Sequence, residues 1–317
     1  MPLATRETPF LLRALRLLRT SGTREFLRVA RAHFLFRWAR AARVSRFWLL
    51  KLQAKDRFQI YEIQGSKMAL DLEDLGLSLD LVLDGVREPL STRALPSFLR
   101  KGDVALDIGS NIGYYLLQES RLVGAEGRVY GLEPEEENFR LLQRNIALNR
   151  YDNVEVFQLA AGAENMEASM YLSRHSNLHS LVTPTESSQA TQPTTVVTVD
   201  QFLADKPRPS FIRMDVEGYE YEVLLGMEKI LERPDPLVLF IEVHPHFLGA
   251  RKTGLLLNIL DQARFETVQI AKSWLKEQEM ARGGPPDFSF HHLSDLLANS
   301  SFVSGELGAF EIFFKRE

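Results

Sequence analysis

Two strand-like segments of this sequence end in side chains that suit acid–base chemistry. In "SFIRMDVEG" an apolar run ends at Asp215, with Glu217 two residues further on, and in "PLVLFIEVHP" a second run ends with Glu242 and His244 at the same spacing. Side chains two apart lie on one side of a strand. If the two strands are neighbours, all four side chains converge in one cleft, where a histidine that titrates near neutral pH could deprotonate a hydroxyl.

The same carboxylates and imidazole leave other interpretations open. Together they could bind an amine or a divalent metal, and Glu217 alone could simply stabilise the N-terminus of the helix that follows Gly218. The spacing matches no metal motif, and the chain has no cysteine. We therefore expect no metal site and take Asp215, Glu217 and His244 as the candidate catalytic residues.

A turn with two glycines, "VALDIGSNIGYYLL", offers a place for a cofactor. A strand ends at Ile108 and a helical pattern starts near Gly113. Ligands of open α/β sheets bind outside the carboxyl ends of strands, and glycine allows the backbone to come close to them. The dinucleotide fingerprint requires G-x-G-x-x-G, whereas Asn111 occupies the middle position here. The turn therefore argues against NAD, although a plain tight turn could contain the same residues.

The next two strands supply further candidates for a cofactor site. Glu133 ends the strand "YGLEP", twenty residues after Gly113, which is where an acid accepts hydrogen bonds from ribose hydroxyls in nucleotide-binding βαβ units. The third strand ends in "LAAG", so Ala160 and Ala161 offer small side chains against which an adenine could pack. An exposed glutamate and an ordinary strand exit are the alternatives.

Strands and helices must alternate along the chain to hold these residues. We expect strands at residues 103–108, 127–134, 153–162, 210–218, 236–245, 265–271 and 307–316, with helices at 113–123, 136–149, 219–232 and 253–263. This rhythm predicts a parallel sheet with helices on both faces. Residues 167–173 are expected to add an edge hairpin strand, and 174–195 to form a long polar loop.

The N-terminal part of the chain differs in charge from the rest. Residues 1–51 contain twelve Lys and Arg and two acidic residues, whereas the 317-residue chain has a formal net charge of −4. Arginines interrupt its apolar runs, which argues against a transmembrane helix and a secretory signal. We expect residues 1–58 to form a basic amphipathic helical extension, followed by a Rossmann-like domain at 59–317, in which 59–101 bridge to a core at 102–317.

The basic extension has several possible partners. An anionic membrane surface, contacted through residues 1–50 of a cytoplasmic protein, is our expectation; a solvated helical face and an organelle transit peptide are alternatives. We expect no nucleic-acid partner, because the rest of the chain is acidic and contains no evident stacking platform.

Taken together, the motifs resemble those of the FkbM-type S-adenosylmethionine-dependent methyltransferases. The segments that carry the resemblance are "VALDIGSNIGYY", "VYGLEPEEENFRLLQRNIALN", "FIRMDVEGYEYEVLLGM" and "LVLFIEVHP", and they follow one another in the family's order. "GVREPL" also resembles a Glu-Pro element ahead of the first strand, which adds Glu88 to the candidates for cofactor binding. The resemblance implies a class I methyltransferase fold, α/β with a seven-stranded, mostly parallel sheet whose last strand is antiparallel.

The resemblance also implies roles for single residues. Glu133 would hold the ribose of the cofactor, while Asp215 and Glu217 would face the methyl group and the acceptor. Ala161 remains a cofactor-site candidate on the evidence of "LAAG" alone. The methionine end of the cofactor would be lined by Asp107, Gly109, Asn111 and Gly113. Ser110 departs from the alanine that is common in the family. The N-terminal extension lies outside the resemblance.

The function that these observations favour is methyl transfer from S-adenosylmethionine to a hydroxyl on a sugar, a polyketide or a lipid-like small molecule. The rival hypotheses are an NAD-dependent oxidoreductase, which Asn111 argues against, and a non-catalytic membrane-associated scaffold, which the intact Asp107, Glu133 and Asp215 argue against. The identity of the acceptor is not encoded in any motif that we recognise.

Overall fold

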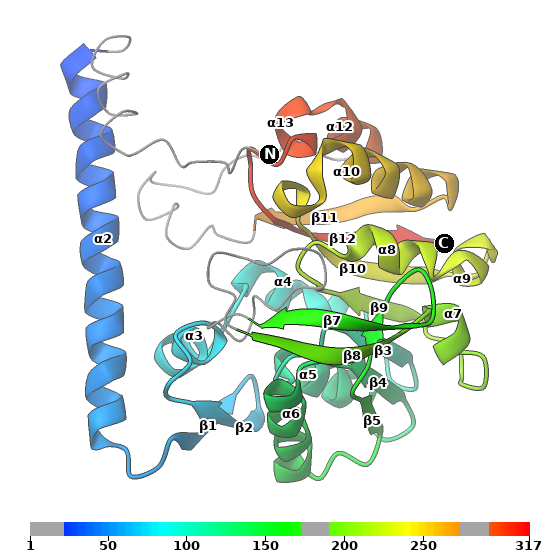
Figure 1. The fold of residues 1–317 in the computed structure, drawn as a ribbon, viewed down its shortest axis with the longest axis horizontal. Helices are drawn as coiled ribbons and strands as arrows, with labels where there is room; N and C mark the ends of the chain where they lie inside the picture. Colours follow the sequence, from blue (N-terminus) through cyan, green and yellow to red (C-terminus); the bar gives the residue numbers. More distant parts are fainter. Residues whose placement is uncertain (1–21, 173–189, 273–291) are drawn as a thin grey trace. The chain divides into compact units, whose positions relative to one another are not determined.

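The computed structural model describes residues 22–172, 190–272 and 292–317 (Figure 1). Contacts divide the described chain into two units, which we treat separately: helix α2, Gly22–Gln53, and a compact core unit that begins at Ala54. Residues 1–21 of the predicted extension and 174–189 of the predicted loop lie outside the described residues.

The core unit is built on a seven-stranded sheet with the order β11-β12-β10-β9-β3-β4-β5. Its strands are β3 (Val104–Ile108), β4 (Arg128–Leu132), β5 (Val154–Phe157), β9 (Phe211–Met214), β10 (Leu237–Val243), β11 (Glu266–Lys272) and β12 (Phe310–Arg316). The neighbours from β10 to β5 pair in parallel, whereas β12 is antiparallel to both β10 and β11. The predicted fold class, a mostly parallel sheet with an antiparallel last strand, is confirmed.

Alternating side chains of the strands belong to two separate apolar clusters, one on each face of the sheet. All seven residues of β10 are buried, which explains its uninterrupted apolar sequence. Leu239 and Ile241 belong to the cluster that includes α10, whereas Val238 and Phe240 belong to the cluster that includes α5. We call these faces the α10 side and the α5 side.

Helices cover both faces of the sheet. The α5 side is covered by α3 (Leu77–Asp84), η1 (Leu95–Ser97), α5 (Tyr114–Val123) and α6 (Glu136–Asn149), and α4 (Pro89–Ala94) precedes η1. The α10 side is covered by α7 (Val199–Phe202), α8 (Glu220–Leu225), α9 (Glu228–Glu232), α10 (Pro245–Gln262), α12 (Leu293–Ala298) and α13 (Ser300–Val303). Both faces of the sheet are therefore buried, and the predicted site residues lie at the carboxyl ends of its strands.

Two small sheets complete the core unit. β1 (Phe58–Ile63) pairs with β2 (Ser66–Asp71) in the predicted bridging segment. β6 (Ala160–Ala161), β7 (Met166–Leu172) and β8 (Ala190–Val197) form a three-stranded sheet in the order β6-β8-β7. The prediction of loop up to residue 195 was wrong for 190–195, because the polar sequence of β8 belongs to a strand with mostly exposed or half-buried side chains.

Helix α2 is a single helix of 32 residues. Among the helices that the structure describes, none is long and apolar enough to cross a bilayer.

Candidate active site

A cavity opens at the carboxyl ends of β3, β4 and β9, and it collects most of the predicted site residues. The predicted residues in its wall are Gly109, Asn111, Glu133, Ala161, Asp215 and Glu217. The wall also contains Pro134, Asn138, Leu159, Met170, Val216 and Tyr219, which sequence reasoning did not single out. Nothing in the sequence marks this second group, because most of it is apolar and two of its members depend on how the small β6-β8-β7 sheet folds over.

The two glycines of the turn between β3 and α5 have different tasks. Gly109 has a φ of 81°, and a Cβ there would lie 1.9 Å from the backbone oxygen of Asp215, so only glycine fits. Gly113 has a φ of 96° and caps the N-terminus of α5; it is not in the cavity wall, and its missing Cβ leaves room for Leu142 of α6. Gly109 thus shapes the cavity, whereas Gly113 packs the helix that follows.

Glu133 is held by the backbone at the edge of the cavity. Its Oε2 accepts a hydrogen bond from the backbone N of Asn111 at 2.7 Å, and its Oε1 accepts one from the backbone N of Glu135 at 2.9 Å. Burial raises the pKa of Glu133 to about 8, against the lowering effect of these two bonds. Each carboxylate oxygen retains a lone pair, so the fixed side chain can accept hydrogen bonds from two adjacent hydroxyls.

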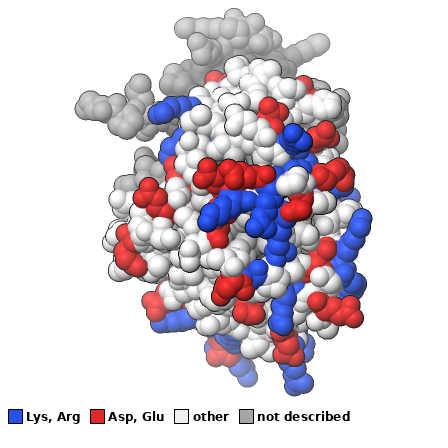
Figure 2. Space-filling model, turned by 90° about the vertical axis from the view of Figure 1, so that its right-hand side faces the viewer, with Lys and Arg blue, Asp and Glu red and all other residues white. Residues whose placement is uncertain are grey.

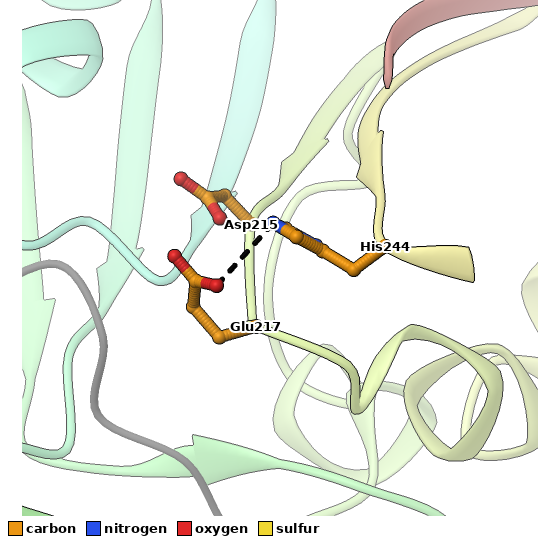
Figure 3. Close-up of side chains that lie close together, drawn as sticks. All are labelled: Asp215, Glu217 and His244. Atoms are coloured by element: carbon orange, nitrogen blue, oxygen red, sulfur yellow. Dashed lines mark ion pairs between the residues drawn. The ribbon is translucent and has the colours of Figure 1, made fainter. Parts of the chain in front are cut away.

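The acidic strand ends converge as the sequence spacing requires. β9 and β10 are neighbours, and Nε2 of His244 lies 3.4 Å from Oε2 of Glu217 and 3.6 Å from Oε1 of Glu242. Figure 3 shows Asp215 and Glu217 on one segment, facing the imidazole of His244. Glu217 lines the cavity and His244 does not, so Glu217 lies between the histidine and the cavity.

Glu220, a residue that sequence reasoning left without a role, orients His244. Its side chain is fully buried; Oε1 lies 2.6 Å from Nδ1 of His244 and accepts a hydrogen bond from the backbone N of Gly218 at 3.0 Å. A carboxylate can only accept, so Nδ1 carries the proton of this bond. Nε2 therefore faces Glu217 and Glu242. The signal was the third acid in "DVEGYE", at the start of the following helix.

Burial and neighbouring charges shift the pKa values in this cluster: the carboxylates raise the pKa of His244, whereas His244 lowers the pKa values of Glu217 and Glu242. Burial is the largest influence on His244 and lowers its pKa, but Glu217 and Glu220 outweigh it and hold that pKa well above its usual value. Burial raises the pKa of Glu217 well above its usual value, and burial also raises the pKa of Glu242 to about 7. A protonated His244 favours the ionised form of Glu217, against the effect of burial.

A buried arginine links the end of β3, next to the two-glycine turn that is the predicted cofactor turn, to the acidic side chains that follow β9. Arg213 of β9 donates from Nη1 to Oδ1 of Asp107 and from Nη2 to Oδ2 of Asp215, both at 2.9 Å. Its guanidinium also lies 4.4 Å from the ring centre of Tyr115. Asp107 is fully buried and absent from the cavity wall, so it acts on the site through Arg213. A lone arginine within the apolar run "FIRM" was the available signal.

Glu88 also lies outside the cavity wall and anchors a second buried network. Its Oε2 accepts from the hydroxyl of Tyr115, and its Oε1 accepts from Nε of Arg87, both at 2.8 Å. On β12, Glu311 is paired across the strands with Glu242 and accepts a hydrogen bond from Ser91. This network and Arg213 all lie on the α5 side of the sheet, and Tyr115 contacts both.

Three of the predicted site residues have a strained backbone conformation. Of the six non-glycine residues with positive φ in the described part of the chain, three are predicted site residues: Glu88, Asn111 and Glu217, each with a φ of 49°. Such conformations cost free energy, and they persist where the surrounding structure enforces them, often at functional sites.

One group of side chains in the described residues has the spacing of a metal site. Asp215, Glu217 and His244 each offer one ligand atom, and these atoms lie within 4.8 Å of one another. Arg213 already donates to one carboxylate oxygen of Asp215, so a metal ion bound there would be placed close to a guanidinium cation.

Comparisons with known proteins extend this picture. A family model described as the methyltransferase FkbM domain matches residues 107–297. Among curated proteins, the probable cobalt-precorrin-6B C(15)-methyltransferase (decarboxylating) of Saccharolobus solfataricus is 47% identical over 47 residues, which is 15% of this chain. The chain spans only 24% of the length of that relative.

Solved structures include similar folds at low identity. A SAM-dependent methyltransferase from Aquifex aeolicus is 18% identical, with a TM-score of 0.39 over 78% of this chain and 95% of its own. Fibrillarin from Aeropyrum pernix, solved in complex with natively bound S-adenosyl-L-methionine, is 13% identical, with a TM-score of 0.38 over 81% of this chain and 82% of its own.

The family match begins at Asp107, at the end of β3, and includes the cofactor turn, Glu133, both acidic strand ends and His244. It spans more than half of the chain. The chain therefore belongs to the FkbM family of S-adenosylmethionine-dependent methyltransferases.

Proposed function

We propose that the protein methylates a hydroxyl group on a sugar, a polyketide or a lipid-like small molecule. The observation that carries this proposal is the row of Glu217, His244 and Glu220, which runs from the cavity wall into the interior through contacts of 3.4 and 2.6 Å. A hydroxyl must lose its proton when it is methylated, and this row offers an acceptor for that proton beside the cavity.

The cavity fits the cofactor of the family. Glu133 would accept hydrogen bonds from the ribose hydroxyls, the backbone at Gly109 and Asn111 would approach the methionine end, and the small side chains of Ala160 and Ala161 would leave room for the flat base. S-adenosylmethionine supplies a methyl group that its sulfonium charge already activates. Family membership removes the NAD-dependent alternative of the sequence analysis.

The protein contributes position and a proton acceptor. Glu217 would contact the acceptor hydroxyl and take its proton, with Nε2 of His244 donating to the carboxylate from behind. Glu220 keeps His244 in the tautomer and orientation that this requires, and Arg213 fixes Asp215 on the neighbouring wall. Holding the oxygen in line with the methyl group accounts for much of the remaining rate, because both reactants are then bound in one geometry.

We also propose that no metal takes part, as the sequence analysis expected. The support is Arg213, which donates a hydrogen bond to Oδ2 of Asp215. Its positive charge would repel a metal ion bound to the same carboxylate. An amine acceptor is the chemical alternative, and the products distinguish the two: a hydroxyl gives a methyl ether and an amine gives a methylated nitrogen.

The test uses the full chain, S-adenosylmethionine with a labelled methyl group, and a panel of hydroxylated sugars, polyketides and lipids, with product structures read by NMR and mass spectrometry. We expect a labelled methyl ether, lost in Glu217→Gln but not in Glu232→Gln, a matched control at an exposed position of α9. Calorimetry of S-adenosylmethionine binding to both variants accompanies the assay. A methylated nitrogen or carbon as the only product would refute O-methylation, and absence of cofactor binding by the wild type would favour the non-catalytic scaffold.

A further inference from the structure

Helix α2 exposes a row of large apolar side chains. Its exposed members, each with between 48% and 77% of its surface accessible, are Leu27, Phe34, Trp38, Trp48, Leu49 and Leu52. Scattered exposed apolar residues need no explanation, but a contiguous set of this size marks an interaction surface.

These side chains form one stripe along the helix. At about 100° per residue, all six positions fall within an arc of about 100°, and from Leu27 to Leu52 the stripe is roughly 37 Å long. Three further exposed residues fall in the same arc: Ala41 and Ser45, which are small, and Arg31, which lies at its edge. The stripe is therefore continuous over about seven turns of the helix, as expected of a helix that lies on one extended apolar surface.

The charge of α2 indicates which kind of partner surface the stripe can contact. Its sequence contains eight Arg and Lys residues and one Glu, a formal charge of +7. By contrast, Lys and Arg are interspersed with Asp and Glu on the face of the molecule drawn in Figure 2. A second copy of α2 would bring an equal positive charge against the first, so self-association along the stripe is electrostatically unfavourable.

A partner surface that is both apolar and negatively charged would match both the apolar stripe and the positive charge of α2. Nucleic acid matches the charge, but Leu27, Leu49 and Leu52 would gain nothing from a phosphate backbone. An anionic bilayer accepts aliphatic and aromatic side chains at the acyl boundary and Arg and Lys at the headgroups, and tryptophan is enriched at that depth. Lys51 already lies over the ring of Trp48 at 4.8 Å, an arrangement that lets the tryptophan insert while the ammonium stays at headgroup level.

We propose that α2 lies in the plane of an anionic lipid surface, with the stripe from Leu27 to Leu52 inserted at the acyl boundary. This inference goes beyond the proposed function and does not depend on it. It sharpens the expectation from sequence by naming the inserted face and the orientation of the helix: parallel to the membrane, since no described helix is apolar enough to cross it.

The test is flotation of the full chain with vesicles of phosphatidylcholine alone or mixed with phosphatidylglycerol. We expect flotation with the mixed vesicles, a loss of about tenfold or more in partitioning for Trp38→Ser/Leu52→Ser, and a smaller, salt-dependent loss for Arg31→Gln/Arg46→Gln. Val268→Ser is the matched control, because it removes an apolar side chain that is 50% exposed on β11. Cofactor binding and circular dichroism verify that each variant is folded.

Several outcomes would overturn the proposal. Equal flotation of the wild type and the stripe variant would show that the stripe does not insert, and equal binding to both kinds of vesicle would remove the role of charge. Sedimentation that reveals a dimer lost in Trp38→Ser/Leu52→Ser would assign the stripe to a second copy. RNA binding lost in the same variant, without flotation of the wild type, would assign it to nucleic acid.

Discussion

Arginine is used in opposite ways in the two units of this protein. In the core, one guanidinium, Arg213, is 8% exposed at its side chain and has two carboxylate partners at 2.9 Å. In α2, seven arginines and one lysine are distributed along a helix with a single acid. A buried charge acts strongly on a few fixed neighbours, whereas exposed charges are screened over about 10 Å and act collectively. The predictions below test this difference, beginning with the buried charge.

Removing the buried arginine should have the largest effect. Arg213→Met leaves Asp107 and Asp215 without their cation, and breaking a buried pair in this way costs about 3–5 kcal/mol. Arg208→Met is the matched control: its partner Asp235 is about half exposed, and such a pair is worth about 0–1 kcal/mol. Urea denaturation of both variants measures the difference, and similar losses for the two would contradict the importance of burial.

Next in size is the loss of the proton acceptor. Glu217→Gln should lower kcat by about 10²-fold or more while leaving the affinity for S-adenosylmethionine near that of the wild type. A proportional loss of cofactor binding instead would mean that Glu217 holds the cofactor.

The positioning role of Glu220 has its own readout in the pH profile. The active pair requires ionised Glu217 and protonated His244, so activity falls at high pH when His244 loses its proton. Glu220 raises the pKa of His244, so Glu220→Gln should move this alkaline limb to lower pH. The same logic applies to stability: the favourable contribution of protonated His244 is present at low pH and is lost as the pH rises through its raised folded-state pKa. An unmoved alkaline limb in a folded variant would refute the positioning role.

A smaller effect is expected at the ribose. Glu133→Gln keeps the shape but removes a charged acceptor, which should weaken S-adenosylmethionine binding by roughly 1.5–3 kcal/mol. In the wild type, affinity should rise with pH up to about 8, because hydroxyl donors favour the ionised carboxylate whose pKa burial has raised. Calorimetry across this range measures both effects, and a pH-independent affinity would exclude Glu133 as the ribose ligand.

No effect is expected from metal removal. Activity should survive dialysis against a chelator, because Arg213 supplies the positive charge next to Asp215. Loss of activity that a divalent metal alone restores would instead assign Asp215, Glu217 and His244 to a metal site.

Much of the core was predictable because it depends on short-range pattern. The strand that ends at Asp215 and the strand that ends at His244 are marked by apolar runs, and parallel strands with helical crossovers bring their carboxyl ends to one edge. Their side chains indeed lie together, although their roles remain predictions. The pattern did not reveal that Asp107 lies behind the cavity, because spacing gives the position of a residue along a strand and not its partner on the next one.

Other features depend on contacts across long stretches of sequence. β8 is polar and has few buried side chains, so it lacks the apolar alternation that predicts strands, and it forms because β6 and β7 pair with it. Met170 of β7 reaches the cavity wall through this folding. Glu88 was predicted to bind the cofactor, but it lies outside the cavity wall, and its partner Tyr115, 27 residues away, was not inferred.

The contact between Gly109 and the backbone oxygen of Asp215 has a consequence for redesign. Because no side-chain atom fits between them, the predicted cofactor turn and the main chain that follows β9 share one rigid boundary. A loop exchanged from another enzyme after β9 would have to reproduce the path of its main chain, not only its side chains, or it would displace the cofactor turn. Changes at Met170 and Tyr219, which line the cavity and take no part in this contact, should leave the boundary in place.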